Sequence, residues 1–345
     1  MVDCAAIDNA IFIETDGVIK PCCKYVSHNF GHVDNLHNIT FDILRKDKWP
    51  TGCYNCKRQE DNGMHSKRQQ YNELYSDNNY LLDIALGNYC NLKCRMCSAD
   101  NSTSWFTEAR KLGMPVPKGF SLSKKQINAA FDRVDKSKNL TIELKGGEPL
   151  MNPNAEYIFQ KCIEYNAEIK LITNGTLLPD WFVNLLPNLN IDFAISIDGV
   201  KNTYEYVRGD NTFSYDACIE NINKIKSIIG KVRFNYVVQN YTINDMLEFD
   251  SLKLGNINWI VLQNPAYLQC HVMPDENKKP IIEELQNIHN IPIGLIDFFK
   301  KPCDSTLYKQ FIEYSAKIDQ FRSQSLQSTL PHLVNNIGNK YYAGV

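Results

Sequence analysis

Short apolar runs and amphipathic stretches alternate along the chain from residue 81 onward. The runs have the length and composition of β-strands, and between them apolar residues recur at helical spacing. The expected strands cover residues 81–86, 140–145, 169–173, 191–197, 232–238 and 257–263, and the expected helices lie near 101–112, 123–135, 154–165, 179–186, 214–229 and 244–253. Strands that alternate with helices in this way predict βαβ units, a parallel sheet and an α/β fold.

The segments on either side of this array have a different pattern. Residues 1–80 are rich in Cys and Asn and show little periodicity, except for two strand-like pieces around Asp16-Gly17, which predict a hairpin. Residues 57–76 are polar and, apart from Gly63, free of helix breakers, so they predict a surface helix. Residues 266–345 show helical and loop patterns but no clear strand. We therefore expect three parts, covering residues 1–80, 81–265 and 266–345.

The composition narrows the classes of function. The chain of 345 residues has a formal net charge of −2, which argues against binding nucleic acid through a basic face. No apolar run approaches the ~20 residues of a membrane span. The first residues lack the basic segment of a secretory signal and carry acids within their apolar stretch. We therefore expect a cytoplasmic protein that makes no membrane contact.

Twelve cysteines are the unusual feature of the composition. Eight of them fall within the first 97 residues, in tight groups. Disulfides are rare in cytosolic proteins, whereas grouped thiolates there usually bind zinc or an iron–sulfur cluster. The remaining four are isolated, and an isolated cysteine is most often a small buried hydrophobic residue.

Cys90, Cys94 and Cys97 form the most informative group. They have the spacing C-x3-C-x2-C and follow closely on the expected strand 81–86. Three thiolates can hold three corners of a [4Fe–4S] cluster and leave one iron open, as catalytic metal sites keep a position open. The C-terminal ends of strands are also where α/β barrels build their active sites. A buried structural metal loop is the alternative interpretation.

With this motif, the sequence resembles the radical SAM superfamily, and further segments match the family in order along the chain. The resemblance implies that the GGEP segment contacts the amino group of the methionine part of S-adenosylmethionine (SAM). It implies that Ser196 lies near the ribose or carboxylate and that Arg208 pairs with the carboxylate. The SAM contacts that it implies are Gly146, Gly147, Glu148, Pro149, Asn174, Ser196, Arg208, Asn240 and Asn264. One departure is Met96, where the family often has an aromatic residue.

The resemblance also implies a fold and a chemistry. The expected fold is a partial, TIM-like (β/α)6 barrel, with residues 266–345 as a helical tail that caps it. A flavodoxin- or ferredoxin-type protein would reduce the cluster, and SAM would be cleaved to methionine and a 5′-deoxyadenosyl radical. That radical would remove a hydrogen atom from the substrate, while the protein orients the reactants and excludes quenchers.

A second cysteine set precedes the barrel. Cys4, Cys22, Cys53 and Cys56, with Gly17, resemble the first half of a SPASM or twitch domain, although such domains usually follow the barrel. The resemblance implies that these four thiols close one auxiliary [4Fe–4S] cluster. A zinc site is the alternative, because paired C-x2-C thiols are common there. Cys23 is left as a spare neighbour, since adjacent side chains diverge in an extended strand.

The substrate has two interpretations. The auxiliary-cluster segment, through the resemblance, favours a peptide or protein residue that is crosslinked, epimerised or oxidised. A sugar, nucleoside or amino acid is the alternative, and a non-catalytic electron-transfer protein is a remote third. Cys270 follows the last expected strand and could return a hydrogen atom to a substrate radical, or could be a packed thiol.

Overall fold

A single eight-stranded sheet organises the protein. The computed structural model describes residues 3–27, 29–46, 49–75, 78–209, 213–288 and 290–334. The strands are β1 (Ala10–Ile13), β2 (Ile19–Lys20), β3 (Asn79–Ala85), β4 (Asn139–Lys145), β5 (Glu168–Thr173), β6 (Asn190–Ser196), β7 (Arg233–Val238) and β8 (Asn256–Val261). They lie in the order β2-β1-β3-β4-β5-β6-β7-β8 without closing, and of these strand pairs only β1–β2 is antiparallel. The predicted α/β fold with a parallel sheet is confirmed.

The six expected strands correspond to β3 to β8, and the expected hairpin is present as β1 and β2. Gly17 lies at the turn of this hairpin with φ +84°, a conformation that glycine adopts without steric cost. β1 also pairs in parallel with β3, from Ala10 opposite Leu81 to Ile13 opposite Ile84. The sequence did not predict this pairing, which makes the N-terminal segment an edge of the main sheet.

Fourteen α-helices are found among the described residues. They are α1 (Ala6–Asn9), α2 (Tyr54–Asp61), α3 (Lys67–Leu74), α4 (Phe106–Lys111), α5 (Lys124–Phe131), α6 (Ala155–Glu164), α7 (Asp180–Leu185), α8 (Asn202–Val207), α9 (Tyr215–Ile229), α10 (Met246–Ser251), α11 (Lys278–Leu285), α12 (Leu295–Phe299), α13 (Ser305–Arg322) and α14 (Leu326–Thr329). All six expected helices are present, and α8 is an addition to them. The described residues of the C-terminal segment form helices joined by turns, and residues 335–345 of the expected tail lie outside the described residues.

The single helix expected over residues 57–76 is wrong, because two helices occupy this stretch. Gly63 adopts φ +68° just after α2, which ends the helical path. Ser66 then starts α3 with a capping box: its hydroxyl accepts the N–H of Gln69, and the Gln69 side chain accepts the N–H of Ser66. The glycine and the cap together outweigh the helical propensity of the flanking residues.

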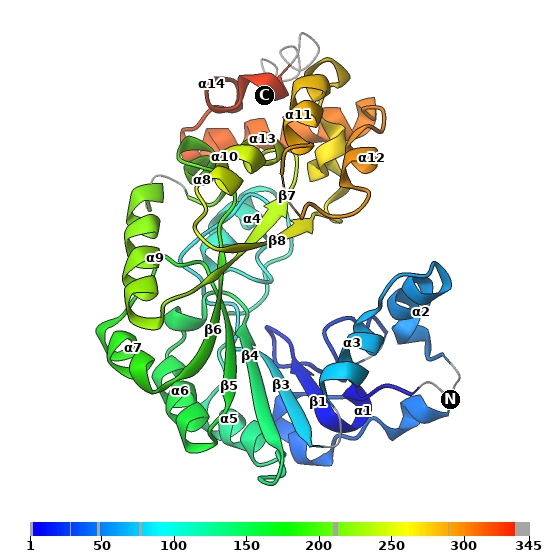
Figure 1. Ribbon diagram of the computed structural model, residues 1–345, viewed down its shortest axis with the longest axis vertical. Helices are drawn as coiled ribbons and strands as arrows, with labels where there is room; N and C mark the ends of the chain where they lie inside the picture. The colour runs from blue at the N-terminus through cyan, green and yellow to red at the C-terminus, as the bar shows by residue number, and fades with distance from the viewer. Residues whose placement is uncertain are drawn as a thin grey trace.

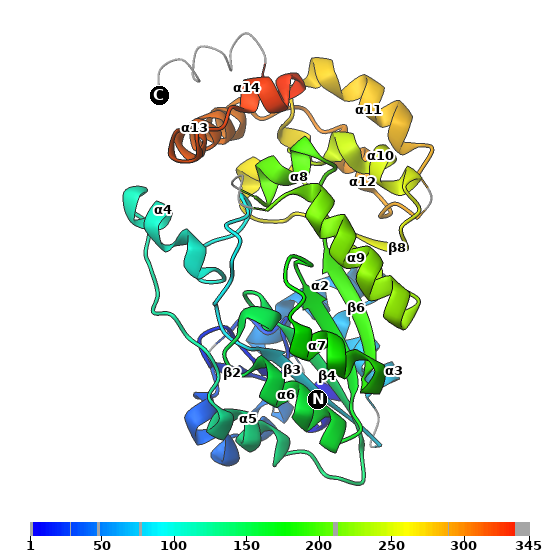
Figure 2. The ribbon, with the colours of Figure 1, turned by 90° about the vertical axis from the view of Figure 1, so that its left-hand side faces the viewer.

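The helices α5, α6, α7 and α9 cover one face of the sheet (Figures 1 and 2). Apolar side chains alternate along each strand, so that residues such as Leu82, Ile142 and Leu171 are fully buried in the core beneath these helices. The C-terminal helices α11 to α14 gather, together with α10, at one end of the sheet (Figure 1). None of the described helices combines the length and apolar character that crossing a membrane requires.

The other face of the sheet is polar. Strand register places four charged residues side by side across β3 to β6, namely Asp83, Glu143, Lys170 and Asp192. Lys145 forms ion pairs with Asp83 at 2.6 Å and Glu143 at 2.9 Å, and Arg233 pairs with Asp192 at 2.7 Å. This charged row (Asp83, Glu143, Lys170 and Asp192) shows that the inner face is not a packed apolar core.

Candidate functional site

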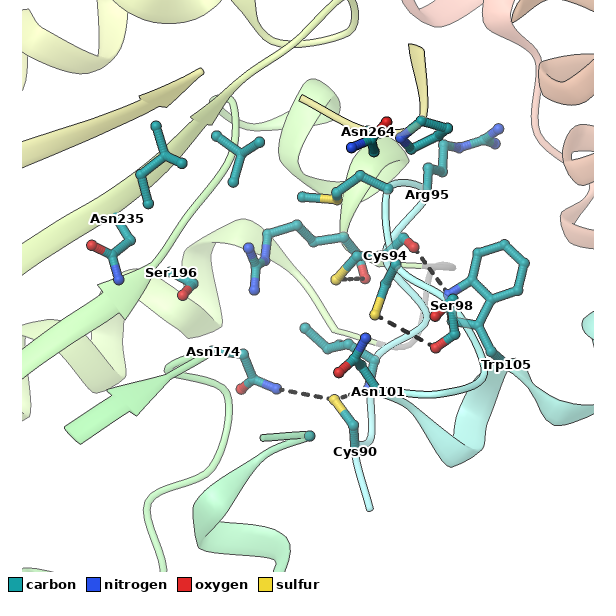
Figure 3. A pocket seen from close by; sticks show the side chains of 18 of the residues that line it. Cys90, Cys94, Arg95, Ser98, Asn101, Trp105, Asn174, Ser196, Asn235 and Asn264 are labelled. Carbon is teal, nitrogen blue, oxygen red and sulfur yellow. Dashed lines mark hydrogen bonds between the residues drawn. The ribbon is translucent and has the colours of Figure 1, made fainter. Parts of the chain in front are cut away.

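A cavity of about 860 Å³ lies where the loops after β3 to β8 meet. Its lining includes most of the residues that the sequence singled out for the cluster and SAM. These are Cys90, Cys94, Cys97, Gly146, Gly147, Asn174, Ser196, Arg208 and Asn264. In Figure 3, Cys90 and Cys94 lie on one side of this cavity, and Ser196 and Asn235 lie on the other. Segments from distant parts of the chain therefore converge on one space, as the C-terminal ends of parallel strands require.

The cysteine loop is held by side chains that follow it in sequence. Cys90 and Cys94 are buried, and Cys97 is half-buried. The Ser104 hydroxyl donates to the Cys90 carbonyl at 2.7 Å, and the Trp105 indole N–H donates to the Cys94 carbonyl at 3.0 Å. Because buried backbone carbonyls need such partners, the segment after the motif fixes the shape of the loop.

The two glycines of the GGEP segment allow close backbone contact with this loop. The Gly147 N–H donates to the Gly87 carbonyl at 2.8 Å. A Cβ atom on Gly147 would lie 2.2 Å from the carbonyl oxygen of Tyr89, and Gly146 adopts φ +120°. Only glycine fits these two positions without moving the residues that precede Cys90.

Glu148 and Asn174 are linked, but only Asn174 reaches the cavity. The Glu148 side chain is 1% exposed. Its carboxylate accepts the Asn174 N–H at 2.7 Å, the Thr173 hydroxyl at 2.8 Å and the Leu150 N–H at 3.1 Å. The Asn174 amide points toward the Cys90 sulfur at 3.9 Å (Figure 3). The structure thus places Glu148 behind the cavity wall, where it orients the turn that carries Asn174.

Arg208 carries an uncommitted donor at the cavity. Its guanidinium is paired with the buried carboxylate of Asp198, while its Nε atom is buried and has no hydrogen-bond partner among the described residues. A buried donor without a partner is costly, so this position suits an anionic ligand group.

Besides Glu148, three more of the residues singled out from the sequence lie away from the cavity. Pro149 is buried beside Glu148 and is not part of the lining. Asn240 is fully buried, and its backbone N–H donates to the Leu268 carbonyl at 2.9 Å. Cys270 is packed in the main core, and burial raises the pKa of its thiol to about 12. The structure does not bring any of these three side chains to the site.

The cavity residues fit the cluster and SAM that the family motif implies. Three thiols, an arginine donor without a partner and a space of about 860 Å³ match a three-thiolate cluster and a nucleoside-sized ligand that carries a carboxylate. Burial raises the pKa of the Cys90 and Cys97 thiols to about 12. In the described part of the chain, no three His, Cys, Asp or Glu side chains already converge as a metal-binding group. Loading a metal would therefore release protons and draw the thiols together.

The second cysteine set lines one small cavity of about 20 Å³. Cys4, Cys22, Cys53 and Cys56 line it together with aromatic residues and Arg68. Cys23 is not part of this lining. Cys23 lies near Asp83 on the polar face of the sheet. Burial, and then the Asp83 carboxylate, raise the pKa of its thiol.

Comparison with known proteins identifies the central segment. Residues 84–252 match the family model of the Radical SAM superfamily. This segment is a radical SAM domain. The expectation of a radical SAM enzyme is confirmed at the level of this domain, which contains Cys90, Cys94 and Cys97.

Curated relatives extend the similarity beyond the domain. The radical SAM cyclopropyl synthase TigE of Paramaledivibacter caminithermalis is 21% identical over 74% of this chain and 57% of its own length. Molybdenum cofactor biosynthesis protein 1 of Dictyostelium discoideum is 26% identical over 85% and 41%. The sporulation killing factor maturation protein SkfB of Bacillus subtilis is 28% identical over 36% and 28%. The chain thus spans about half or less of the length of these relatives.

Among solved structures, SuiB of Streptococcus suis bound to S-adenosylmethionine is similar to 72% of this chain and 54% of its own chain. The TM-score is 0.45 and the sequence identity is 14%.

Several lining residues carried no signal in the sequence. Arg95 lies inside the cysteine motif. Tyr267 and Tyr314 come from the C-terminal segment, where their rings lie 5.1 Å apart and are tilted by 50°. Tyr314 belongs to α13, close to the other end of the chain, and no local pattern indicates that this helix returns to the motif.

Proposed function

We propose that the protein is an enzyme that cleaves SAM reductively and uses the resulting radical to remove a hydrogen atom from a substrate. The observation that carries this proposal is the convergence of Cys90, Cys94 and Cys97 with Gly147, Arg208 and the other lining residues in one cavity. A cluster on these thiols supplies the electron that breaks the C5′–S bond of SAM to give methionine and the 5′-deoxyadenosyl radical.

The residues around the cavity divide the task of holding SAM. Arg208, which lines the cavity, donates from its guanidinium to the carboxylate, while Asp198 holds the guanidinium in place. The glycines Gly146 and Gly147 let the ligand approach the backbone closely. The adjoining rings of Tyr267 and Tyr314 cover one wall and keep water from a reactive intermediate.

We propose a peptide or protein residue as the substrate. The similarity to SkfB, whose name describes the maturation of a sporulation killing factor, supports this proposal. The similarity over 85% of the chain to a molybdenum cofactor biosynthesis protein supports the second candidate, a small molecule. The test is to coproduce this protein with a short precursor peptide encoded by a neighbouring gene and to measure the mass of the peptide. A change in mass that occurs with the wild type but not with a Cys90→Ala variant would favour the peptide.

We also propose that a flavodoxin- or ferredoxin-type protein reduces the cluster on Cys90, Cys94 and Cys97, and that Cys4, Cys22, Cys53 and Cys56 hold an auxiliary [4Fe–4S] cluster. The support is that these four thiols line one cavity whereas Cys23 does not. Four ligands would close the cluster, so that its role would be electron transfer, ordering of this segment, or both. Zinc on the same thiols is the alternative.

One experiment tests both metal sites. The chain is reconstituted anaerobically, and iron and zinc are counted in the wild type and in the variant Cys90→Ala/Cys94→Ala/Cys97→Ala. We expect about eight irons in the wild type and about four in the variant, since each cubane holds four. With dithionite and SAM, we expect 5′-deoxyadenosine only from the wild type. Equal iron in both proteins would refute the cluster at Cys90, Cys94 and Cys97. Zinc in place of four of the irons would show that the second cysteine set is a zinc site and not an auxiliary cluster.

A further inference from the structure

The C-terminal helix α13 lies against the loop that carries the cluster cysteines. Arg322, at its last turn, donates to the Lys93 carbonyl at 2.6 Å and to the Glu108 carboxylate at 2.8 Å. Tyr314, two turns earlier, donates from its hydroxyl to the Arg95 carbonyl at 2.5 Å. The carbonyls on either side of Cys94 therefore take their partners from one helix that lies close to the other end of the chain.

Arg95 anchors the loop from the other direction. This side chain, between Cys94 and Cys97, is fully buried, and its guanidinium is paired with Asp319 on α13. It also donates to the Gln324 side chain at 2.9 Å and, through Nε, to the Tyr206 carbonyl at 2.8 Å. The guanidinium lies 3.5 Å from the centroid of the Tyr206 ring, within the range of a cation–π contact.

Asp319 is itself held on both sides. One carboxylate oxygen pairs with Arg95, and the other accepts the Leu326 N–H at 2.6 Å, across the turn between α13 and α14. The side chains of Arg95 and Asp319 are 0% and 4% exposed. A buried ion pair gives little net stability compared with an apolar pair of the same size. The pair therefore matters here for where it holds the loop and not for the stability that it adds.

We propose that α13 is a positioning element of the cluster site, and that Asp319, acting through Arg95, sets the placement of Cys94 and Cys97. This inference rests on the proposed function, because it assumes a cluster on these thiols. Neither Asp319 nor Arg322 touches the cluster cysteines; both act through the loop. Tyr314 combines this role with its place in the cavity wall.

The test compares three variants of the full chain after anaerobic reconstitution. Asp319→Asn keeps the size of the side chain and removes its charge. Tyr314→Phe removes one hydrogen bond and leaves every charge in place, so it keeps the test valid if the first variant fails to fold. Glu313→Gln is the matched control, because Glu313 lies on the same helix in an exposed pair with Lys309 at 3.7 Å.

The readout is the EPR signal of the reduced protein. The part of this signal that changes when SAM is added comes from the cluster on Cys90, Cys94 and Cys97, since only a cluster with an open iron binds SAM. An iron chelator is then added, and the decay of this signal is followed. We expect decay roughly tenfold faster in Asp319→Asn and severalfold faster in Tyr314→Phe, with a changed line shape, because a lost hydrogen bond frees the loop. Glu313→Gln should decay like the wild type.

Decay at the wild-type rate in both Asp319→Asn and Tyr314→Phe would overturn the positioning role, even if their melting temperatures fall. Faster decay in Glu313→Gln as well would overturn it too, because any change on the helix would then suffice. A wild type without a SAM-responsive signal is a different result: it refutes the cluster at Cys90, Cys94 and Cys97, and the positioning role falls with it.

Discussion

Replacing Glu148 with glutamine tests what the GGEP carboxylate does. In the structure this carboxylate accepts three hydrogen bonds, among them the backbone N–H groups of Leu150 and Asn174, and is almost fully buried. An amide keeps one acceptor oxygen and presents an NH2 group at the other position. Whichever way the glutamine is oriented, one of the two backbone N–H groups then faces a donor.

The cost follows from these contacts. A hydrogen bond to a charged group contributes about 1.5–3 kcal/mol, and an unpaired buried N–H costs about 1–3 kcal/mol. Glutamine also removes a buried charge, whose desolvation raises the pKa of Glu148, and this offsets part of the loss. We therefore expect Glu148→Gln to lower the free energy of unfolding by about 2 kcal/mol.

The assay is urea unfolding of the metal-free protein, so that SAM and clusters play no part. Glu164→Gln is the control, because Glu164 lies on the surface of α6 with its side chain 55% exposed, and such changes usually stay within about 0.5 kcal/mol. If Glu148→Gln unfolds like the wild type but binds SAM poorly, the carboxylate contacts the ligand directly and the structural interpretation is refuted.

Three further predictions concern the same protein. Gly147→Ala should lower the free energy of unfolding by about 1–3 kcal/mol, measured in urea, because its Cβ would collide with the Tyr89 carbonyl. Arg208→Lys should raise the dissociation constant for SAM about tenfold or more, measured by EPR titration, because lysine cannot form a forked contact. Glu60→Gln should cost about 1–2 kcal/mol in urea at pH 7, because Glu60 accepts two hydrogen bonds from Arg68.

The last of these predictions depends on pH. The hydrogen bonds from Arg68 lower the pKa of Glu60 below its ordinary value of 4.5. Its contribution is therefore fully present above pH 4.5 and is lost as the pH falls through the lower value in the folded protein. A Glu60→Gln deficit that persisted unchanged at pH 3 would contradict this reasoning. Gly119→Ala is the control for Gly147→Ala, because a Cβ on Gly119 would come no closer than 3.3 Å to a neighbouring atom. If both variants unfold equally early, the collision argument is refuted. Arg208→Lys binding SAM normally would refute the role of the guanidinium.

The sequence was informative wherever a local pattern reports on a local structure. Strands such as Asn139–Lys145 are regular apolar runs, and their ends carried Cys90, Gly146, Asn174 and Ser196 to one cavity, as the topology of a parallel sheet requires. Glu148 illustrates the limit of this reasoning. It shares the GGEP motif with two lining glycines, but the turn after β4 directs its carboxylate into the protein.

Contacts between distant segments could not be predicted. The short strand β1 pairs with β3, although most of the Cys-rich segment separates the two strands in the sequence. A strand of this length carries no pattern that indicates which strand it pairs with. The pairing of Arg95 with Asp319 spans most of the chain, and nothing near either residue indicates the other. Cys270 was a candidate hydrogen-atom donor because it follows the last strand, but its side chain is packed in the core.

The charged row across β3 to β6 means that the two faces of the sheet differ in how well they tolerate substitution. The face beneath α5, α6, α7 and α9 is a close-packed apolar layer, in which a single lost methylene lowers stability. Glu143, Lys170 and Asp192 on the opposite face are only partly buried, so replacing them disturbs little of that packing. The polar face can therefore change in sequence while the apolar layer, and with it the scaffold, stays the same.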